Sequence, residues 1–417
     1  MVLAWSMSCA MAPVPATSDT GSAPTDPPDH LLVLSIDTLR ADFVDAELTP
    51  TLQGLLDDAL HLAEHRSCGN WTYPSLVCAL AGGMPVDVGF VPTVASSPPH
   101  LPSDVRLLAE ELVTAGFQTR LVSTSPYLAD RNGMSAGQQG VAQGGGMPAS
   151  WVVDQALVML DELEGAERQA LHLHFLDPHQ PYDPPDAYLG ELEGLAPVDW
   201  DLHRAEAYHD LDHAWSDLDS DERQLLREHI DVRYRASLRY LDDQIARLLW
   251  ELDERGLLDD TLVLLFSDHG EQFWDRGRLG HGKHPHREEL AALGALVRPG
   301  VPAERWDQPT NHGDLAGLTK AALGIADAPE LPDDRTVLAA DYRELGSWVV
   351  ARRDSRAVIY RWGGAWQAFD LQADPDEQDD LGEPRGDDWD ALRTAAQTYA
   401  QQMADQYFPD GPQPGGR

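Results

Sequence analysis

The chain has 417 residues, of which 42% are hydrophobic and 24% are charged, so it can bury a large core. Seventy acidic residues against thirty basic ones give a formal net charge of −40, which opposes binding to nucleic acid or to an anionic membrane surface. The same charge repels small anions, so a phosphate or sulfate site would need a metal ion and a few placed cations. No apolar run approaches the roughly 18 residues of a membrane-spanning helix.

Residues 1–30 contain a short apolar stub, MVLAWSMSC, followed by a tether rich in Pro, Ser and Thr that is expected to be flexible. The combination of stub, Cys9 and tether resembles a bacterial lipoprotein start, with a lipid anchor at Cys9 and an extracytoplasmic location (periplasm or cell surface). The alternative is a disordered N-terminus without an anchor. Of the other two cysteines, Cys68 and Cys78, the sequence leaves a single bridge open.

The first half of the chain alternates apolar strands with amphipathic helices. Leu31–Ile36 is a continuous apolar run that ends at Asp37, as expected of a buried parallel strand. Four further elements are predicted: helices over Pro50–Leu62, Leu76–Leu80 and Leu107–Ala115, and a strand over Gln118–Ser123. This order indicates repeated strand–helix–strand units.

The second half continues the pattern. Two more buried strands are predicted over Leu171–Phe175 and Thr261–Phe266, and a long amphipathic helix over Tyr234–Arg255. The glycine-rich segment Gly133–Gly146 is expected to be a loop, and the acidic segment Asp183–Asp221 a loop that could serve as a lid. The predicted fold is α/β, with a mostly parallel central sheet flanked by helices.

Beyond Pro332 the pattern changes to short alternating segments. They predict a small C-terminal α+β subdomain over residues 333–417 that contains an antiparallel sheet, beside a main domain over residues 31–332. Its predicted elements are strands over Trp348–Arg352, Ala357–Arg361 and Ala365–Leu371, and a helix over Trp389–Met403.

Polar side chains follow three of the predicted strands. They are Asp37, the pair Asp177 and His179, and the pair Asp268 and His269. Open α/β sheets place ligands at this edge, and carboxylates with imidazoles suit a divalent metal ion. A single Asp after a strand is more often a turn residue or helix cap, but three such ends together favour a metal site.

Several motifs resemble those of sulfatases and related phosphoester and phosphonate hydrolases of the alkaline phosphatase superfamily. In chain order they are Ser35-Ile36-Asp37-Thr38-Leu39-Arg40, Thr49-Pro50-Thr51-Leu52, Trp71-Thr72-Tyr73-Pro74-Ser75, Asp177-Pro178-His179-Gln180-Pro181-Tyr182, Tyr240-Leu241-Asp242-Asp243, Ser267-Asp268-His269-Gly270-Glu271, Gly280-His281-Gly282-Lys283 and Asp374-Pro375-Asp376-Glu377. They occur in the family's order from residue 31 to about residue 381. The resemblance implies the alkaline phosphatase/sulfatase-like fold.

The resemblance also implies the metal ligands and the nucleophile. Asp37, Asp268 and His269 would bind one divalent metal ion, with Thr72 contributing its hydroxyl at the nucleophile position. A metal ion at that position lowers the pKa of the attacking hydroxyl, and a helix start there favours an anion.

Four further residues are candidates for acting on the substrate. His179 and Lys283 would hold substrate oxygens or protonate the leaving group, and Lys283 is one of only two lysines in the chain, the other being Lys320. His281 is a second candidate for that role, or a loop histidine. Asn70 would donate to the transferred group, or simply form a turn.

The departures from the family pattern bear on the reaction. Sulfatases carry Cys or Ser where this chain has Thr72 and an arginine where it has Leu76, so we expect no formylglycine. Thr38 replaces a second acidic ligand, which favours Mn²⁺ or Zn²⁺ over Ca²⁺. The Gly-Lys-Trp-His segment of sulfatase pockets is absent from Ser123–Tyr127.

The sequence therefore predicts a metal-dependent hydrolase of small anionic esters with Thr72 as nucleophile, phosphate or phosphonate esters being favoured over sulfate esters. The alternatives are an arylsulfatase-type sulfuric ester hydrolase, a transferase that passes the phospho group to an alcohol, and a degenerate member that binds anions or glycans without turnover. Substrate choice is assigned to three loops, Gly133–Gly146, Asp183–Asp221 and Phe273–Gly280.

Overall fold

The computed structural model describes residues 26–90, 100–341 and 348–407. Most of the predicted N-terminal tether, including Cys9, lies outside these ranges. In the described part no helix is both long enough and apolar enough to cross a membrane.

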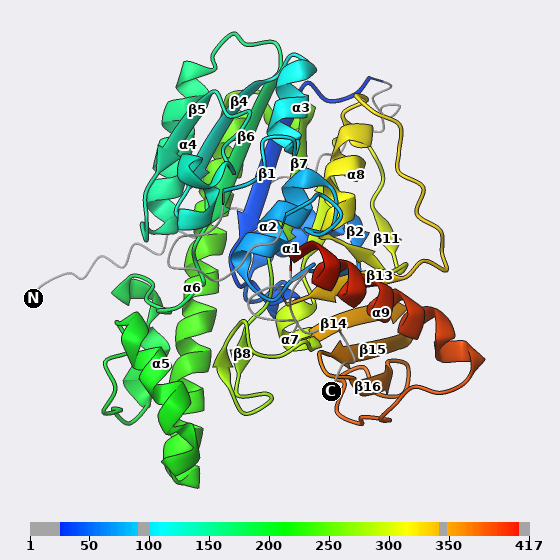
Figure 1. The fold of residues 1–417 in the computed structure, drawn as a ribbon. Coiled ribbons are helices and arrows are strands. Elements are labelled where there is room, and N and C mark those ends of the chain that lie inside the picture. The colour runs from blue at the N-terminus through cyan, green and yellow to red at the C-terminus, as the bar shows by residue number, and fades with distance from the viewer. Residues whose placement is uncertain (1–25, 91–99, 342–347, 408–417) are drawn as a thin grey trace, which may run out of the picture.

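The core of the molecule is an eight-stranded sheet (Figure 1). Its strands in spatial order are β11 (Glu304–Trp306), β2 (Leu60–Leu62), β10 (Gly294–Val297), β7 (Thr261–Ser267), β1 (His30–Ile36), β6 (Gln169–Phe175), β4 (Gln118–Ser123) and β5 (Gly140–Gln143). Only β10 runs against its neighbours, β2 and β7. The predicted α/β fold with a mostly parallel sheet is confirmed.

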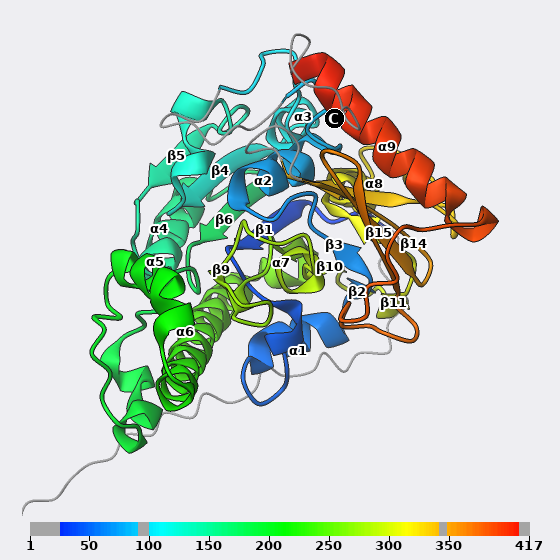
Figure 2. The same ribbon diagram turned by 60° about the horizontal axis from the view of Figure 1, so that its bottom comes forward.

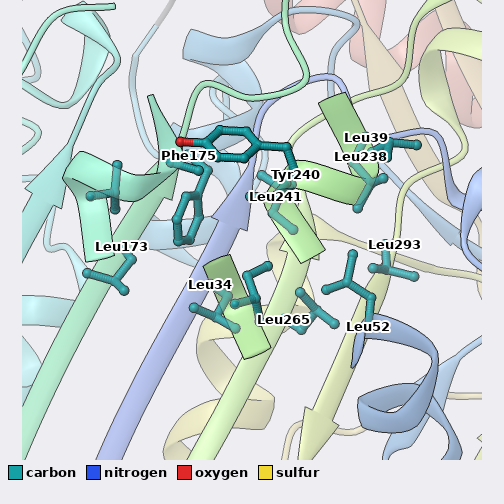
Figure 3. Packing of buried hydrophobic residues seen from close by; sticks show 14 of the residues in the cluster. Leu34, Leu39, Leu52, Leu173, Phe175, Leu238, Tyr240, Leu241, Leu265 and Leu293 are labelled. Carbon is teal, nitrogen blue, oxygen red and sulfur yellow. The ribbon is translucent and has the colours of Figure 1, made fainter. Parts of the chain in front are cut away.

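Helices cover both faces of the central sheet, as Figures 1 and 2 show. On one face lie α1 (Pro50–Asp57), α4 (Ala149–Glu162) and α6 (Ser220–Glu254), and on the other α2 (Thr72–Ala81), α3 (Leu108–Thr114) and α8 (Leu315–Ala322). The alternation of side chains along β1 divides the core, because Leu32 and Leu34 face the first group of helices while Leu31 and Val33 face the second. Figure 3 shows the first layer, in which Leu34 lies among Leu173 of β6, Leu265 of β7 and side chains of α6.

The C-terminal part forms a second, antiparallel sheet of β13 (Val337–Ala340), β14 (Trp348–Arg353), β15 (Arg356–Arg361) and β16 (Ala365–Asp370). The long helix α9 (Asp387–Tyr407) packs across it (Figure 1). The predicted antiparallel sheet in the C-terminal part is therefore confirmed. Smaller elements are the pairs β3 (His65–Arg66) with β12 (Thr310–Asn311) and β8 (Gln272–Phe273) with β9 (Leu279–Gly280), and the short helix α7 (Arg287–Leu290).

The predicted helix Pro50–Leu62 is wrong in its second half. The helix ends at Asp57, and Leu60–Leu62 form strand β2. Leucines two residues apart suit either a strand or part of a helical stripe, so their spacing did not identify the boundary.

Two predicted loops contain regular structure. Gly133–Gly146 includes β5, an edge strand paired only with β4, whose short polar sequence gives little strand signal. Asp183–Asp221 includes the helix α5 (Ala205–Ala214) and the first two residues of α6, which starts 14 residues before the predicted Tyr234. The acidic residues of α5 make its sequence look like a polar loop, because the buried stripe of Tyr208 and Leu211 is narrow.

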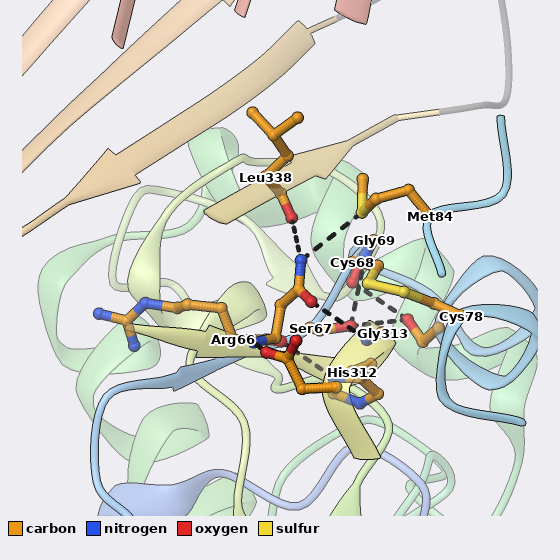
Figure 4. Close-up of a disulfide and its surroundings, with 12 residues drawn as sticks. Arg66, Ser67, Cys68, Gly69, Cys78, Met84, His312, Gly313 and Leu338 are labelled. Carbon is orange, nitrogen blue, oxygen red and sulfur yellow. Dashed lines mark hydrogen bonds between the residues drawn. A yellow bond between two sulfur atoms is a disulfide. The ribbon is translucent and has the colours of Figure 1, made fainter. Parts of the chain in front are cut away.

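Helix α2 starts at Thr72 rather than at Leu76. Pro74 lies in its first turn, where a missing N–H group breaks no intrahelical hydrogen bond. Cys68, just before the helix, forms a disulfide with Cys78 in its last turn (Figure 4). The bridge spans 10 residues and, in the chain-entropy description, contributes about 2 to 3 kcal/mol. The bridge connects the segment before the helix that carries Thr72 to the last turn of that helix.

Candidate active site and metal centre

Asp37 and Asp268 lie side by side because β1 and β7 are parallel neighbours in register. Ile36 pairs with Ser267, so the next residue of each strand emerges at the same edge of the sheet. Asp268 N donates to Ile36 O at 3.1 Å, which extends the pairing into the site. The two carboxylates and the imidazole of His269 form a fully buried group whose potential ligand atoms lie within 4.8 Å of one another.

The imidazole of His269 presents one nitrogen to this group. Its Nδ1 lies 2.8 Å from Gly270 O and donates to it, which leaves a lone pair on Nε2. Nε2 is 3.7 Å from Asp37 Oδ1 and 3.5 Å from Asp268 Oδ2. A neutral imidazole in this tautomer is the form that binds a metal ion.

The hydroxyl of Thr72 points into the same group from the first residue of α2. Thr72 Oγ1 is 3.4 Å from Asp37 Oδ2 and 3.5 Å from His269 Nε2, and the residue is buried. The predicted nucleophile and the three predicted metal ligands thus come together from β1, β7 and α2. At a helix start the first N–H groups have no intrahelical acceptor, which favours a negative charge on the bound group.

The donor set fits a divalent cation. Asp37 Oδ1 and Asp268 Oδ2 are buried and have no hydrogen-bond partner among the described residues. Burial and the charge of Asp37 hold the pKa of Asp268 well above its usual range. Burial would also raise the pKa of Asp37, but His179, His174 and His269 bring it below its usual value. Two buried carboxylates with unsatisfied oxygens, and no lysine or arginine paired with them among the described residues, are what a metal ion would neutralise.

Two further histidines lie against the group. His281 packs its ring 4.5 Å from that of His269, and His179 packs 5.1 Å from His281, between ring centroids. Burial would lower the pKa of His281, but Glu271, whose Oε1 lies 3.0 Å from His281 Nδ1, raises it above its usual value. His281 thus lies next to the cluster and is paired with Glu271, a residue to which the sequence assigned no role.

The ammonium of Lys283 does not contact the carboxylates of this group. Its Nζ donates to Asp212 Oδ2 of α5 at 2.7 Å and to Leu279 O. Asp212 also binds the guanidinium of Arg278 through both carboxylate oxygens. Burial would raise the pKa of Asp212, but Arg278 and Lys283 lower it to about 2. The position of Lys283 therefore depends on α5, an element that the sequence analysis treated as a loop.

A buried carboxylate, Glu289, holds the segment around Lys283. Its Oε2 accepts from Asn70 Nδ2 at 2.7 Å and Lys283 N at 2.9 Å, and its Oε1 accepts from Gln272 Nε2 at 2.6 Å and His284 N at 2.9 Å. The side-chain donor of Asn70 is therefore used within the protein. Burial raises the pKa of Glu289 to about 7.

Glu289→Ala is expected to lower the free energy of unfolding by about 3 kcal/mol, because it removes the acceptor of four hydrogen bonds, two of them buried and two part-buried. Urea denaturation would measure the loss. Glu304→Ala, which removes an exposed carboxylate from β11, is the matched control and should change stability by less than about 0.5 kcal/mol. Equal effects of the two substitutions would contradict the role given to Glu289.

Asp177, at the third strand end, serves a structural purpose. Its Oδ2 accepts from Ala149 N at 2.8 Å and so caps the start of α4, and no described metal-ligand group includes it. For this residue the helix-cap interpretation is correct. Burial raises the pKa of Asp177 to about 6.

Asp177→Asn is expected to stabilise the metal-free protein at neutral pH. The native state holds the Asp177 proton more tightly than the unfolded chain, so native stability falls as pH rises from about 4 to about 6 and stays reduced above that range. Asparagine keeps an acceptor for Ala149 N without the charge. Urea denaturation in chelator should give the variant a free energy of unfolding up to about 3 kcal/mol higher than that of the wild type at neutral pH. The difference should disappear near pH 4. A variant that is less stable at neutral pH would contradict this account.

A buried polar chain below the site was also missed. Ser35 Oγ lies 2.8 Å from His172 Nε2 and 2.9 Å from His174 Nδ1, and His174 Nε2 is 3.8 Å from Asp37 Oδ2. The alternation of His172 and His174 along β6 places both on one face of the sheet. That spacing was the signal available in the sequence.

Known proteins share both sequence and fold with this chain. A choline-sulfatase of Rhizobium meliloti (strain 1021) is 31% identical over 170 residues, 37% of this chain and 33% of the relative, so the match spans a third of the relative's length. A solved protein in complex with its substrate D-glucosamine-2-N,6-O-disulfate superposes with a TM-score of 0.71 at 15% identity, covering 93% of this chain and 99% of the other. A phosphonate monoester hydrolase from Silicibacter pomeroyi gives a TM-score of 0.66 at 19% identity, with 92% and 96% covered.

These structural likenesses establish a common fold. The sequence model of the sulfatase family matches residues 29–316, which include the two strand-end acids, His269 and the start of α2. That match covers well over half of the 417 residues. The chain therefore belongs to the sulfatase family of the alkaline phosphatase superfamily.

Proposed function

We propose that the protein is a metal-dependent ester hydrolase in which Thr72 is the nucleophile. The observation that carries the proposal is the position of Thr72 Oγ1, 3.4 Å from Asp37 and 3.5 Å from His269 at the start of a helix. Asp37, Asp268, His269 and the Thr72 hydroxyl would hold one divalent ion, Mn²⁺ or Zn²⁺ in preference to Ca²⁺. When bound, the ion would lower the pKa of the Thr72 hydroxyl and neutralise charge on a substrate oxygen.

The remaining steps use side chains of the chain itself. The Thr72 hydroxyl would pass its proton to solvent, and Thr72 Oγ1 would form a bond to the phosphorus of the ester while the bond from phosphorus to the leaving oxygen breaks. His281 or His179 supplies the proton that the leaving oxygen takes, and the pairing of His281 with Glu271 supports His281 as a proton carrier. Lys283 and His179 would bind the oxygens of the transferred group and stabilise their negative charge. Water then attacks phosphorus and releases Thr72; an alcohol in place of water would make the protein a transferase.

Phosphate or phosphonate esters are the favoured substrates. A formylglycine hydrate releases sulfate by returning to the aldehyde, whereas a threonine adduct must be cleared by attack of water, which is more plausible at phosphorus. The likeness to a phosphonate monoester hydrolase supports this preference, and the matched choline-sulfatase supports the sulfuric ester alternative. Loss of the arginine at the position of Leu76 supports a third option, a binding member without turnover.

We further propose an extracytoplasmic location, with a lipid anchor at Cys9 and a tether over residues 1–30 ahead of a catalytic domain over residues 31–332 and a C-terminal subdomain over residues 333–417. The disulfide between Cys68 and Cys78 supports this location, because such bonds persist in oxidising compartments.

The test is turnover of matched aryl phosphate, phosphate diester, phosphonate ester and sulfate ester substrates, with metal-loaded and metal-stripped protein assayed side by side. Cleavage of phosphorus esters by the loaded protein alone supports the proposal. Cleavage of the sulfate ester in preference to them would favour a sulfuric ester hydrolase. Metal binding without turnover of any substrate would favour the binding member.

A further inference from the structure

Two exposed histidines lie one turn apart on the outer face of α5. His209 and His213 are four residues apart, and their Nε2 atoms approach to 3.2 Å. The ring centroids are 4.5 Å apart with the planes inclined at 67°. Helix α5 lies beside α6 (Figures 1 and 2), and neither histidine belongs to the group of Asp37, Asp268 and His269.

We propose that His209 and His213 form a second metal site that takes a borderline transition ion such as Zn²⁺, Cu²⁺ or Ni²⁺. Imidazole nitrogens bind such ions at about 2.0 to 2.1 Å, so two nitrogens 3.2 Å apart would subtend about 100° at the ion, close to the tetrahedral angle. The side chains are therefore already spaced for binding, and little rotamer entropy would be lost on loading.

A hydrogen bond between two neutral imidazoles would give the same separation, with one Nε2 carrying the proton. A metal ion replaces that proton and needs a lone pair on both nitrogens. Asp210 favours this state at His209, because its Oδ1 lies 3.5 Å from His209 Nδ1 and attracts the proton to that nitrogen. On binding, the proton of His213 would move through solvent from Nε2 to Nδ1, so that Nε2 offers its lone pair and the imidazole stays neutral.

The surroundings of the pair suit a cation. Glu206 lies one turn before His209, but its Oε2 lies 3.5 Å from Arg204 Nε, so the two histidines carry the site and solvent would complete the coordination. Asp210 and the net charge of −40 raise the local concentration of divalent cations. Two imidazoles exclude Ca²⁺ and Mg²⁺ as the preferred ions, since those take oxygen ligands.

Loading this site would stabilise the helical state of α5. The same helix carries Asp212, which binds Lys283 and Arg278. A metal ion that joins residues four apart holds one turn of the helix closed, and so it should slow amide exchange in α5.

The experiment is a calorimetric titration of Zn²⁺ into the full chain carrying Asp268→Asn, which disables the candidate catalytic centre. One zinc ion per chain is expected to bind, and adding His213→Gln or His209→Gln should weaken that binding by about tenfold or more. His203→Gln, which removes a neighbouring exposed histidine, is the control and should leave the affinity unchanged.

A second measurement does not depend on that background. With Cu²⁺ added to the wild-type chain, electron paramagnetic resonance should show an ion with two nitrogen ligands that is lost in the double variant His209→Gln/His213→Gln. Zn²⁺ should also slow hydrogen exchange of α5 amides in the wild type but not in the double variant. Unchanged zinc affinity and copper spectrum in the double variant would overturn the proposal, whatever the outcome of the turnover assays.

Discussion

Thr72→Ala is expected to lower kcat/KM for every substrate that the protein turns over by at least about a thousandfold. The substitution removes the hydroxyl oxygen that lies 3.4 Å from Asp37 and 3.5 Å from His269. Thr72→Ser keeps that oxygen and should stay within about tenfold of the wild type. The measurement is steady-state turnover at equal metal content, with metal determined on the same samples.

The control for this prediction is Thr114→Ala, which removes a threonine hydroxyl from the exposed end of α3 and should leave turnover unchanged. A rapid-quench burst that leaves phosphate on Thr72 in the wild type, and no burst in Thr72→Ala, would support a covalent adduct. If Thr72→Ala turned substrate over at the wild-type rate, water would have to be the nucleophile and the proposed role of Thr72 would be wrong.

The central sheet and its strand-end acids could be predicted because buried parallel strands have a simple sequence pattern, a continuous run of apolar residues. Continuous apolar runs such as Leu31–Ile36 stand out from the polar sequence around them, and the residue after each run lies at a common edge. That Asp37 and Asp268 share an edge of the sheet follows from that rule, whereas their contact also requires β1 and β7 to be neighbours, which the strand patterns do not show. The closeness of Thr72 to them does not follow from it, and rested on the family resemblance.

The partners of Lys283 could not be predicted, because they depend on how distant segments dock. Asp212 is 71 residues away in sequence, and Asn70 is 219 residues from Glu289. Neither separation leaves a local pattern of apolar and polar residues. Helix α5 was missed for a related reason: its exposed acidic face outweighs its narrow apolar stripe of Tyr208 and Leu211.

The second large effect is expected at the cluster of Asp37, Asp268 and His269, because its buried charges affect both the stability of the protein and its metal binding. Without a metal ion, the buried carboxylates Asp37 and Asp268 each have an oxygen without a partner. Burial and the Asp37 charge raise the pKa of Asp268, so the native state holds its proton more tightly than the unfolded chain does. Native stability is therefore reduced at any pH above the unfolded value of about 4, and most strongly at alkaline pH.

Asp268→Asn is expected to make the metal-free protein more stable than the metal-free wild type near pH 8, by about 2 kcal/mol. The variant keeps an oxygen to accept from Thr38 N and His269 N, and loses the buried charge. With Mn²⁺ or Zn²⁺ added, the order should reverse, because only the wild type binds the ion tightly and gains stability from it. The measurement is the free energy of unfolding of both proteins by urea denaturation, once with chelator and once with added metal ion.

Asp177→Asn is the matched control, since it also removes a buried carboxyl of raised pKa but lies outside the described metal-ligand group. It should stabilise the protein without metal and still allow the full gain when metal is added. If Asp268→Asn gained as much from the metal as the wild type does, Asp268 would not be a ligand. If Asp268→Asn were less stable than the wild type in chelator, the buried charge of Asp268 would not destabilise the metal-free native state. The unsatisfied oxygens of the cluster would then be no argument for a bound cation.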